Sequence, residues 1–230
     1  MTLTATSVNS MDFEKARYNM VEQQVRPWNV LDDHVLEVIN AVPREEYTPE
    51  KYKQLAYADI HIPLGDDENG VCMLNPNIEG RILQNLNIGE NDVVLEIGTG
   101  TGYLTACLSK LARHVDSVEI DPALSALAIK NLAAHDITNV TVSTGDASKK
   151  WDQKQFYDAI VISGSMPDIP EAYKKMLKEG GRMFVVTGEA PAMTAHLITR
   201  TAKDEWTTVD LFETCITALC GAETAKEFNF

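Results

Sequence analysis

Three glycines at alternate positions, Gly98, Gly100 and Gly102, are the residues of this chain best suited to contact a ligand through their backbone. They follow the apolar run Val93–Ile97, and a helical pattern begins directly after them. This order predicts a buried parallel strand, a tight turn with little side-chain bulk, and a helix N-terminus. Such a turn lets a ligand approach the main chain at the carboxyl edge of an open sheet. Glycine turns after strands also serve packing, so the motif needs support from other residues.

Acidic residues stand where three neighbouring strands of the predicted sheet end. Glu96 closes the first strand, and Glu119 closes the second, where a carboxylate can accept hydrogen bonds from both hydroxyls of a ribose. Asp146 follows the third strand, at a place where it can accept from an adenine amino group. Two of these residues also have a simpler interpretation. Glu119 could be a solvated strand-end residue, and Asp146 could be an ordinary turn aspartate. Their joint occurrence favours an adenosyl ligand.

The spacing of the glycines indicates which adenosyl ligand this is. In G-x-G-x-G the third glycine comes one residue earlier than in the dinucleotide fingerprint G-x-G-x-x-G, which favours a ligand without a pyrophosphate. A cationic sulfonium prefers negative or polar walls, whereas a diphosphate does not. We therefore predict that the cofactor is S-adenosylmethionine, with Glu96 facing its methionyl ammonium or its sulfonium.

Composition excludes several other classes of function. The 230 residues carry a net charge of −14, which repels phosphate backbones and argues against a nucleic-acid substrate, although solubility alone is an alternative reason for such a charge. No apolar stretch approaches membrane-spanning length, so we expect a soluble, cytoplasmic protein without a membrane partner. The 4 cysteines form no C-x-x-C pair, which indicates reduced thiols and no metal site.

The pattern of elements predicts a mostly parallel sheet covered on both faces. We expect a flexible tail at 1–10, a helical cap with an acceptor loop at 11–80, and a methyltransferase domain at 81–230. Helices are expected from Ser10 to Arg26 and at about 32–42, 49–56, 75–86 and 191–200. The expected strands span about 92–97, 115–120, 139–143, 157–163 and 181–187, with helices starting near Gly102, Pro122 and Asp168 and a last strand pair around 207–218.

Three segments carry a resemblance to a known family. The pieces V-P-R-E-E-Y-T-P at 42–49, A-Y-A-D-I-H-I-P-L-G at 56–65 and L-E-I-G-T-G-T-G-Y-L-T-A at 95–106 resemble protein-L-isoaspartate O-methyltransferases, in matching order from about Asn19 to Gly188. The resemblance implies an α/β class I S-adenosylmethionine-dependent methyltransferase (Rossmann-like) sandwich with an N-terminal helical extension. It also implies a protein or peptide substrate, in which the α-carboxylate of an isoaspartyl residue is esterified; the ester can then cyclise to a succinimide and reopen as aspartate. The cofactor positions that it implies are Gly98, Thr99, Gly100, Gly102, Glu119, Asp146 and Ala147.

The acceptor segment departs from the family pattern G-x-T-I-S-x-P-H. Residues 70–77 read G-V-C-M-L-N-P-N, so Leu74 replaces the serine and Asn77 the histidine. A leucine offers no hydrogen bond to a carboxylate, and the acidic residues at 66–68 would repel one. We expect Met73, Leu74, Asn75 and Asn77 to form the acceptor wall, with Asn75 or Asn77 supplying the lost hydrogen bond. The hydroxyls of the segment S-G-S at 163–165 are a partial substitute.

No catalytic side chain is predicted. The methyl group of a sulfonium is already activated and a carboxylate acceptor is ionised at neutral pH, so alignment and exclusion of water suffice. His61 and His114 are accordingly interpreted as surface or structural residues. Three hypotheses remain open: an isoaspartyl carboxyl methyltransferase, a methyltransferase with another acceptor, and a cofactor-binding module without chemistry. The oligomeric state is not predicted.

Overall fold

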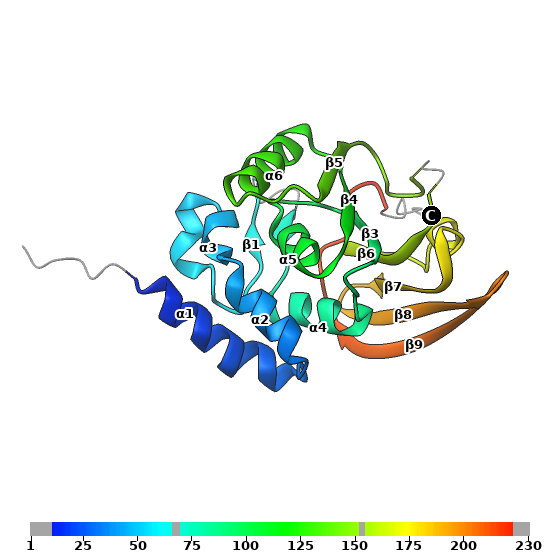
Figure 1. Cartoon of the computed structure of the whole chain (residues 1–230), viewed down its shortest axis with the longest axis horizontal. Helices are drawn as coiled ribbons and strands as arrows, with labels where there is room; N and C mark the ends of the chain where they lie inside the picture. The colour runs from blue at the N-terminus through cyan, green and yellow to red at the C-terminus, as the bar shows by residue number, and fades with distance from the viewer. Residues whose placement is uncertain (1–10, 66–69, 152–154, 223–230) are drawn as a thin grey trace, which may run out of the picture.

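A seven-stranded sheet runs through the molecule, with the strand order β5-β4-β3-β6-β7-β8-β9 (Figure 1). The computed structural model describes residues 11–65, 70–151 and 155–222. Neighbouring strands are parallel from β5 to β7, whereas β8 and β9 are antiparallel to their neighbours. The strands are β3 (Val93–Ile97), β4 (His114–Glu119), β5 (Val140–Thr144), β6 (Tyr157–Met166), β7 (Leu177–Glu189), β8 (Ala192–Ala202) and β9 (Glu205–Thr214).

Strand β3 is the centre of this arrangement. All its residues are buried, as expected of an apolar strand in a sheet covered on both faces. It pairs with β4 on one side and with β6 on the other, so the chain reverses its direction of travel across the sheet at this strand. In open α/β sheets ligands bind outside the carboxyl ends of the strands at such a reversal. The glycine turn therefore follows the strand where a ligand site is expected.

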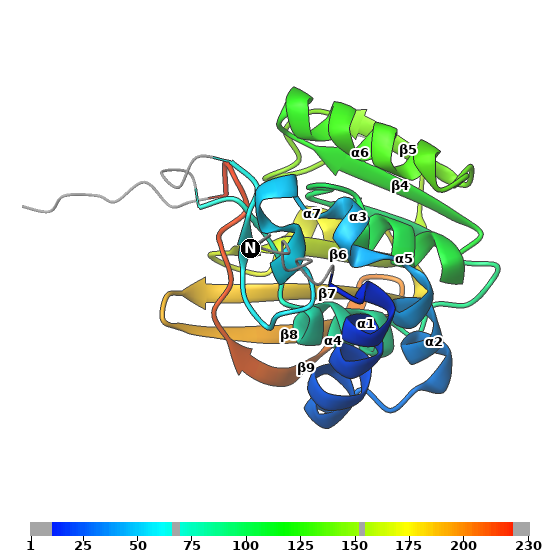
Figure 2. The same cartoon turned by 90° about the vertical axis from the view of Figure 1, so that its left-hand side faces the viewer.

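Helices cover the two faces unequally. On one face of the sheet, Val94 belongs to an apolar cluster that includes residues of α4 (Pro76–Leu86), α5 (Tyr103–Leu111) and the N-terminal helices. On the other face, Leu95 and Ile97 belong to a smaller apolar cluster beside α7 (Glu171–Lys174). Figure 2 places α6 (Pro122–Ala134) with β4 and β5 at one end of the sheet and β8 and β9 at the other. A two-residue hairpin of β1 (Ile62–Pro63) and β2 (Cys72–Met73) stands outside the sheet.

The N-terminal third is helical, as predicted. It contains α1 (Phe13–Met20), α2 (Asp33–Ala41), α3 (Arg44–Tyr47), a π-helical turn at Val21–Val25 and 3-10 turns at Arg26–Trp28 and Glu50–Leu55. Asp12, whose carboxylate accepts from Lys15 N, is the N-cap of α1; the predicted cap Ser10 and the tail at 1–10 lie outside the described residues. The expected division at residue 80 falls inside α4, and a single apolar cluster joins this third to the sheet.

The five strands predicted between residues 92 and 187 are confirmed, but the predicted helix at 191–200 is wrong. These residues belong to β8, which pairs with β7 on one side and β9 on the other. Met193, Ala195 and Leu197 alternate toward the larger apolar cluster, with the period of a strand. The strand pair expected around 207–218 is also wrong, because β9 ends at Thr214 and takes β8 as its partner.

Candidate functional site

A cavity opens at the carboxyl ends of β3, β4 and β6, where ligands of open α/β sheets bind. Segments far apart in the sequence meet around it. Its walls are formed by Leu64, Val71, Cys72, Ile97, Gly98, Gly100, Val118, Glu119, Ile120, Gly145, Ala147, Ser148, Ser163, Gly164 and residues 217–220.

The glycine turn has a conformation that other residues rarely adopt. The φ angles of Gly98, Gly100 and Gly102 are 92°, 56° and 89°. A Cβ atom on Gly98 would stand 2.4 Å from Ser163 Oγ, and one on Gly100 would stand 3.2 Å from Leu64. The turn is fixed to β4, because Gly98 N donates to Val118 O at 2.8 Å. Glycine is thus required here both by the backbone and by the close approach of neighbouring groups.

Glu119 is the acidic side chain that the structure brings to this cavity. It is only 5% exposed, and its Oε2 accepts from Gly100 N at 2.8 Å while Oε1 accepts from Asp121 N at 3.0 Å. Each oxygen keeps a further lone pair, because a carboxylate has about four acceptor sites. Glu119 therefore links the glycine turn to the end of β4 and can still accept from two hydroxyls of a ligand.

The segment after β5 contributes two of its residues to the wall. Ala147 and Ser148 line the cavity and are buried. Asp146 is exposed and lines a separate hollow with Trp151 and neighbouring residues. Its Oδ1 accepts from Ser148 N at 2.8 Å, a hydrogen bond that holds the pKa of Asp146 below its ordinary value. Asp146 thus shapes the turn that presents Ala147 and Ser148, and lies beside the cavity instead of in its wall.

Glu96 does not reach the cavity wall, contrary to the expectation that it faces the ligand. Side chains alternate along a strand, so Glu96 shares its face with Val94, beneath α5. Its Oε2 accepts from Thr105 Oγ1 at 2.5 Å and from Ser117 Oγ at 2.6 Å, whereas Oε1 has no partner among the described residues. Burial, with a smaller contribution from Glu119, raises the pKa of Glu96 to about 7 despite those two hydroxyls.

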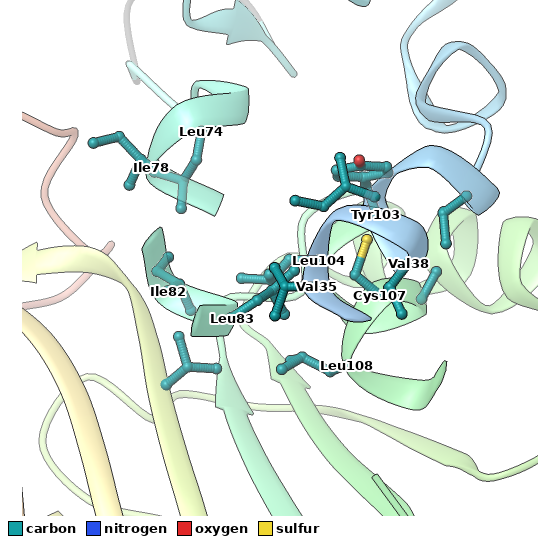
Figure 3. Close-up of a cluster of buried hydrophobic side chains, with 14 of the residues drawn as sticks. Val35, Val38, Leu74, Ile78, Ile82, Leu83, Tyr103, Leu104, Cys107 and Leu108 are labelled. Atoms are coloured by element: carbon teal, nitrogen blue, oxygen red, sulfur yellow. The ribbon is translucent and has the colours of Figure 1, made fainter. Parts of the chain in front are cut away.

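A second hollow adjoins the first and shares Leu64, Cys72, Gly98, Gly100 and Ser163 with it. The predicted acceptor residues Met73 and Leu74 line it, together with residues of the glycine turn, α5 and α4. Leu74 is only 7% exposed and lies beside Ile78 in the apolar cluster of Figure 3. The side chain that replaces the family serine is therefore apolar and packed.

Asn75 and Asn77 lie outside both hollows. Their Nδ2 atoms donate to the two carboxylate oxygens of Asp59, at 2.9 Å and 3.2 Å, and Asn77 Oδ1 accepts from Ile78 N. Because Asp59 already occupies these amides, the expectation that one of them replaces the serine hydroxyl is not supported. The acidic residues at 66–68 lie outside the described residues.

Sequence reasoning missed two parts of the site. The first is the segment 217–220 after β9, held against β6 because Ser165 N donates to Thr217 O and Leu219 N donates to Ser165 O, each at 2.9 Å. No local pattern predicts this contact, which depends on tertiary structure. The second is Glu79, a carboxylate that lines the second hollow. The sequence could have indicated Glu79, because it is spaced by three, four and seven residues from the apolar Ile82, Leu83 and Leu86 of the same helix. This spacing places a carboxylate on the buried face of the helix.

An open sheet that reverses its strand order at a glycine turn, with a strand-end carboxylate facing that turn, defines the class of the protein as a class I methyltransferase. The solved structure of a protein-L-isoaspartate O-methyltransferase aligns with 91% of this chain and 66% of its own, at a TM-score of 0.76 and 26% identity. A candidate member from Plasmodium falciparum, solved with S-adenosyl-L-homocysteine, aligns at a TM-score of 0.75 over 91% of this chain and 99% of its own; at 20% identity it supports the fold alone.

Sequence comparison identifies the family. The model of the protein-L-isoaspartate(D-aspartate) O-methyltransferase family matches residues 15–223. The protein-L-isoaspartate O-methyltransferases of Petrotoga mobilis and Protochlamydia amoebophila are 36% and 39% identical, over 83% and 81% of this chain and 88% and 86% of theirs. The chain belongs to this family. The predicted fold and the predicted class of enzyme, a methyltransferase, are confirmed.

Two absences apply to the described part of the chain. Its side chains form no group of three or more histidines, cysteines, aspartates or glutamates that could hold a metal ion. Among its helices, none combines the length and the apolar character needed to cross a bilayer.

Proposed function

We propose that this chain transfers a methyl group from S-adenosylmethionine to the free α-carboxylate of isoaspartyl residues in proteins or peptides. The observation that carries the proposal is the cavity at the end of β3, in which a glycine turn faces the Glu119 carboxylate, in a chain whose family match spans residues 15–223. Protein repair follows from the chemistry, because the ester can form a succinimide that reopens as aspartate. We also place the protein in the cytoplasm, in keeping with its four free cysteines.

The residues around the cavity fit the cofactor. Glu119 accepts from the ribose hydroxyls, Ala147 and Ser148 lie along the adenine, and the backbone of Gly98, Thr99 and Gly100 faces the rest of the cofactor. Gly102, also predicted as a cofactor position, lines neither hollow and packs instead against Ala128 and Leu132 of α6. Glycine at 98 leaves room for Ser163 Oγ, and both residues line the two hollows. When bound, S-adenosylmethionine supplies a methyl group that its sulfonium has already activated.

The chain itself has to orient the acceptor and exclude water. Leu64, Cys72 and Ser163 line both hollows, so the middle of a cofactor that extends through the two would lie beside them, close to the acceptor residues Met73 and Leu74. Thr217 Oγ1 lies 3.2 Å from Cys72 Sγ on this wall, so a hydroxyl and a thiol stand near the position of the lost serine. A carboxylate needs no general base at neutral pH, and hydrogen bonds from such groups are enough to align it.

The decisive experiment is transfer of a labelled methyl group to an isoaspartyl peptide, with the same peptide carrying ordinary aspartate as the matched control. We expect base-labile label on the isoaspartyl peptide only. Glu119→Gln, which keeps the size of the side chain but removes its charge, is expected to weaken binding of S-adenosylhomocysteine about 10- to 100-fold. Equal labelling of both peptides, or unchanged binding by this variant, contradicts the proposal.

A second candidate function keeps the reaction and changes the acceptor. It is favoured by the buried, apolar Leu74 and by the engagement of Asn75 and Asn77 with Asp59. The same labelled cofactor applied to a mixture of cellular proteins and metabolites distinguishes the two. Label on a product other than an isoaspartyl ester, with the isoaspartyl peptide unmodified, would establish the second candidate.

A further inference from the structure

Glu79 is a buried carboxylate that the proposed reaction has not used. It is 4% exposed, comes from the first turn of α4, and lines the second hollow opposite Thr99, Thr101 and Tyr103 of the glycine turn and α5. This hollow continues from the cofactor cavity beyond Gly98 and Gly100, on the side away from the adenine end at Ala147 and Ser148. A carboxylate thus stands where the remainder of an adenosyl ligand would extend.

The charges around Glu79 do not balance. Its neighbour Arg44, from α3, is fully buried, donates to Glu79, and also donates to Ala56 O at 2.8 Å and Leu74 O at 2.6 Å. Glu96 from β3 interacts electrostatically with Glu79 and has one oxygen without a partner among the described residues. This region therefore holds two buried carboxylates but one buried guanidinium, which pairs with Glu79 and not with Glu96. The charge of such a group is costly unless it is paired, so the cluster must bind a proton or a further cation.

We infer that Glu79 binds the α-ammonium group of the methionyl portion of the cofactor. The inference rests on the proposed placement of the cofactor and extends it to the end opposite the adenine. A charged carboxylate is a strong acceptor for an ammonium, and the cation supplies the positive charge that the cluster of Arg44, Glu79 and Glu96 lacks. Glu79 takes the role that the sequence suggested for Glu96, because it lines the hollow and Glu96 does not.

The protonation of Glu79 provides an independent signal. Burial raises its pKa to about 8 against the lowering effect of Arg44. The other titratable groups that face it are Glu96 from β3 and Tyr103 and Cys107 from α5, and the pKa values of both α5 groups are raised by burial. With its pKa raised in this way the carboxyl binds a proton part of the time near pH 7, and an arriving ammonium stabilises its charged form beside Arg44. Binding of the cofactor product should then release a proton from Glu79.

The test compares two ligands by titration calorimetry: S-adenosylhomocysteine and its deamino analogue, which keeps the carboxylate but lacks the ammonium. Glu79→Gln should weaken S-adenosylhomocysteine about 10- to 100-fold and leave the affinity for the analogue within about 3-fold. In buffers of different ionisation enthalpy at pH 7, the wild type should release a proton with S-adenosylhomocysteine but not with the analogue. Asp116→Asn is the matched control, because Asp116 is a buried carboxylate on β4 that lines neither hollow, and it should change either affinity by less than about 3-fold.

Removing one partner of a buried ion pair can unfold a protein, so a second variant is needed. Arg44→Met combined with Glu79→Leu removes both charges. Like Glu79→Gln, this double variant should weaken binding of S-adenosylhomocysteine and leave the affinity for the deamino analogue nearly unchanged. Equal weakening of both ligands, no proton release by the wild type, or an equally large effect of Asp116→Asn overturns the inference. If Glu119→Gln weakens both ligands while Glu79→Gln weakens neither, the cofactor placement stands and only the role of Glu79 fails. If Glu119→Gln weakens neither ligand, both fail.

Discussion

Replacement of Gly98 by alanine tests the glycine turn most directly, because the structure predicts two separate costs. At a φ of 92° an L-residue is strained, which costs about 1–3 kcal/mol. The new Cβ would also stand 2.4 Å from Ser163 Oγ, which now donates to Ile97 O and Gly98 O at 2.9 Å and 2.6 Å. The hydroxyl must turn away and give up these hydrogen bonds, at about 0.5–1.5 kcal/mol. We expect a total loss of about 2–4 kcal/mol in the free energy of unfolding.

A double-mutant cycle separates the two costs. In a Ser163→Ala background the next contact of the new Cβ is Leu219 Cδ1 at 3.4 Å, an ordinary van der Waals distance, so the backbone strain is the main cost that remains. The loss caused by Gly98→Ala should then be smaller by about 1 kcal/mol, measured by urea denaturation. Gly89→Ala is the matched control, because its nearest contact is Asp92 at 3.8 Å and its φ is not left-handed, and it should change stability by less than about 0.5 kcal/mol. An unchanged stability of Gly98→Ala, or identical losses in both backgrounds, would refute the reasoning.

Two further predictions concern buried residues of the site. Leu74→Ser should cost about 2–4 kcal/mol of stability, because it removes a packed side chain, yet raise kcat/KM for an isoaspartyl peptide about 10-fold by restoring a donor; a drop in kcat/KM in a folded variant would contradict this. Glu96→Gln should change the pH dependence of stability. Burial raises the pKa of Glu96 from 4.5 to about 7, so its neutral form favours folding below about pH 4.5, and this stability is lost as the pH rises to 7. The free energy of unfolding of Glu96→Gln minus that of the wild type, measured by urea denaturation, should therefore increase by up to about 3 kcal/mol between pH 4.5 and 8. A difference that does not change with pH would exclude the raised pKa.

Local patterns predicted the parallel part of the sheet well. The run at 93–97 is continuously apolar except for Glu96 and ends at glycines, which leaves few alternatives to a buried strand. The segment 191–200 lacked such signals, since its alanine, methionine and leucine residues also suit a helix. Pairing with β7 and β9 decides its structure, and no local pattern contains that information. The same limit applies to 217–220, which becomes part of the site only through its contact with β6.

The site residues also divide into those that local sequence predicts and those that depend on tertiary contacts. Glu119 was predicted at the cavity because a strand end near the glycine turn fixes where its side chain lies. For Glu96 the strand was predicted correctly, but the face of the sheet on which its side chain lies was not considered. Successive side chains along a strand point to opposite faces, so a residue at the strand end does not always face the ligand. The roles of Asn75 and Asn77 could not be deduced, because Asp59, which holds both amides, is separated from them by 16 and 18 residues.

The surroundings of Leu74 explain how its side chain can differ from the family serine without a change in the framework. Its carbonyl oxygen accepts from Arg44 at 2.6 Å, and Arg44 is held in turn by Glu79 and by Ala56 O. The position of the backbone at 74 is therefore set by a buried ion pair, while the side chain packs in the apolar cluster beside Ile78 (Figure 3). A serine at 74 would enter the same backbone geometry at the edge of the second hollow. Changes in the turnover of isoaspartyl peptides by Leu74→Ser can thus be attributed to the hydroxyl, provided that the variant keeps the affinity of the wild type for S-adenosylhomocysteine.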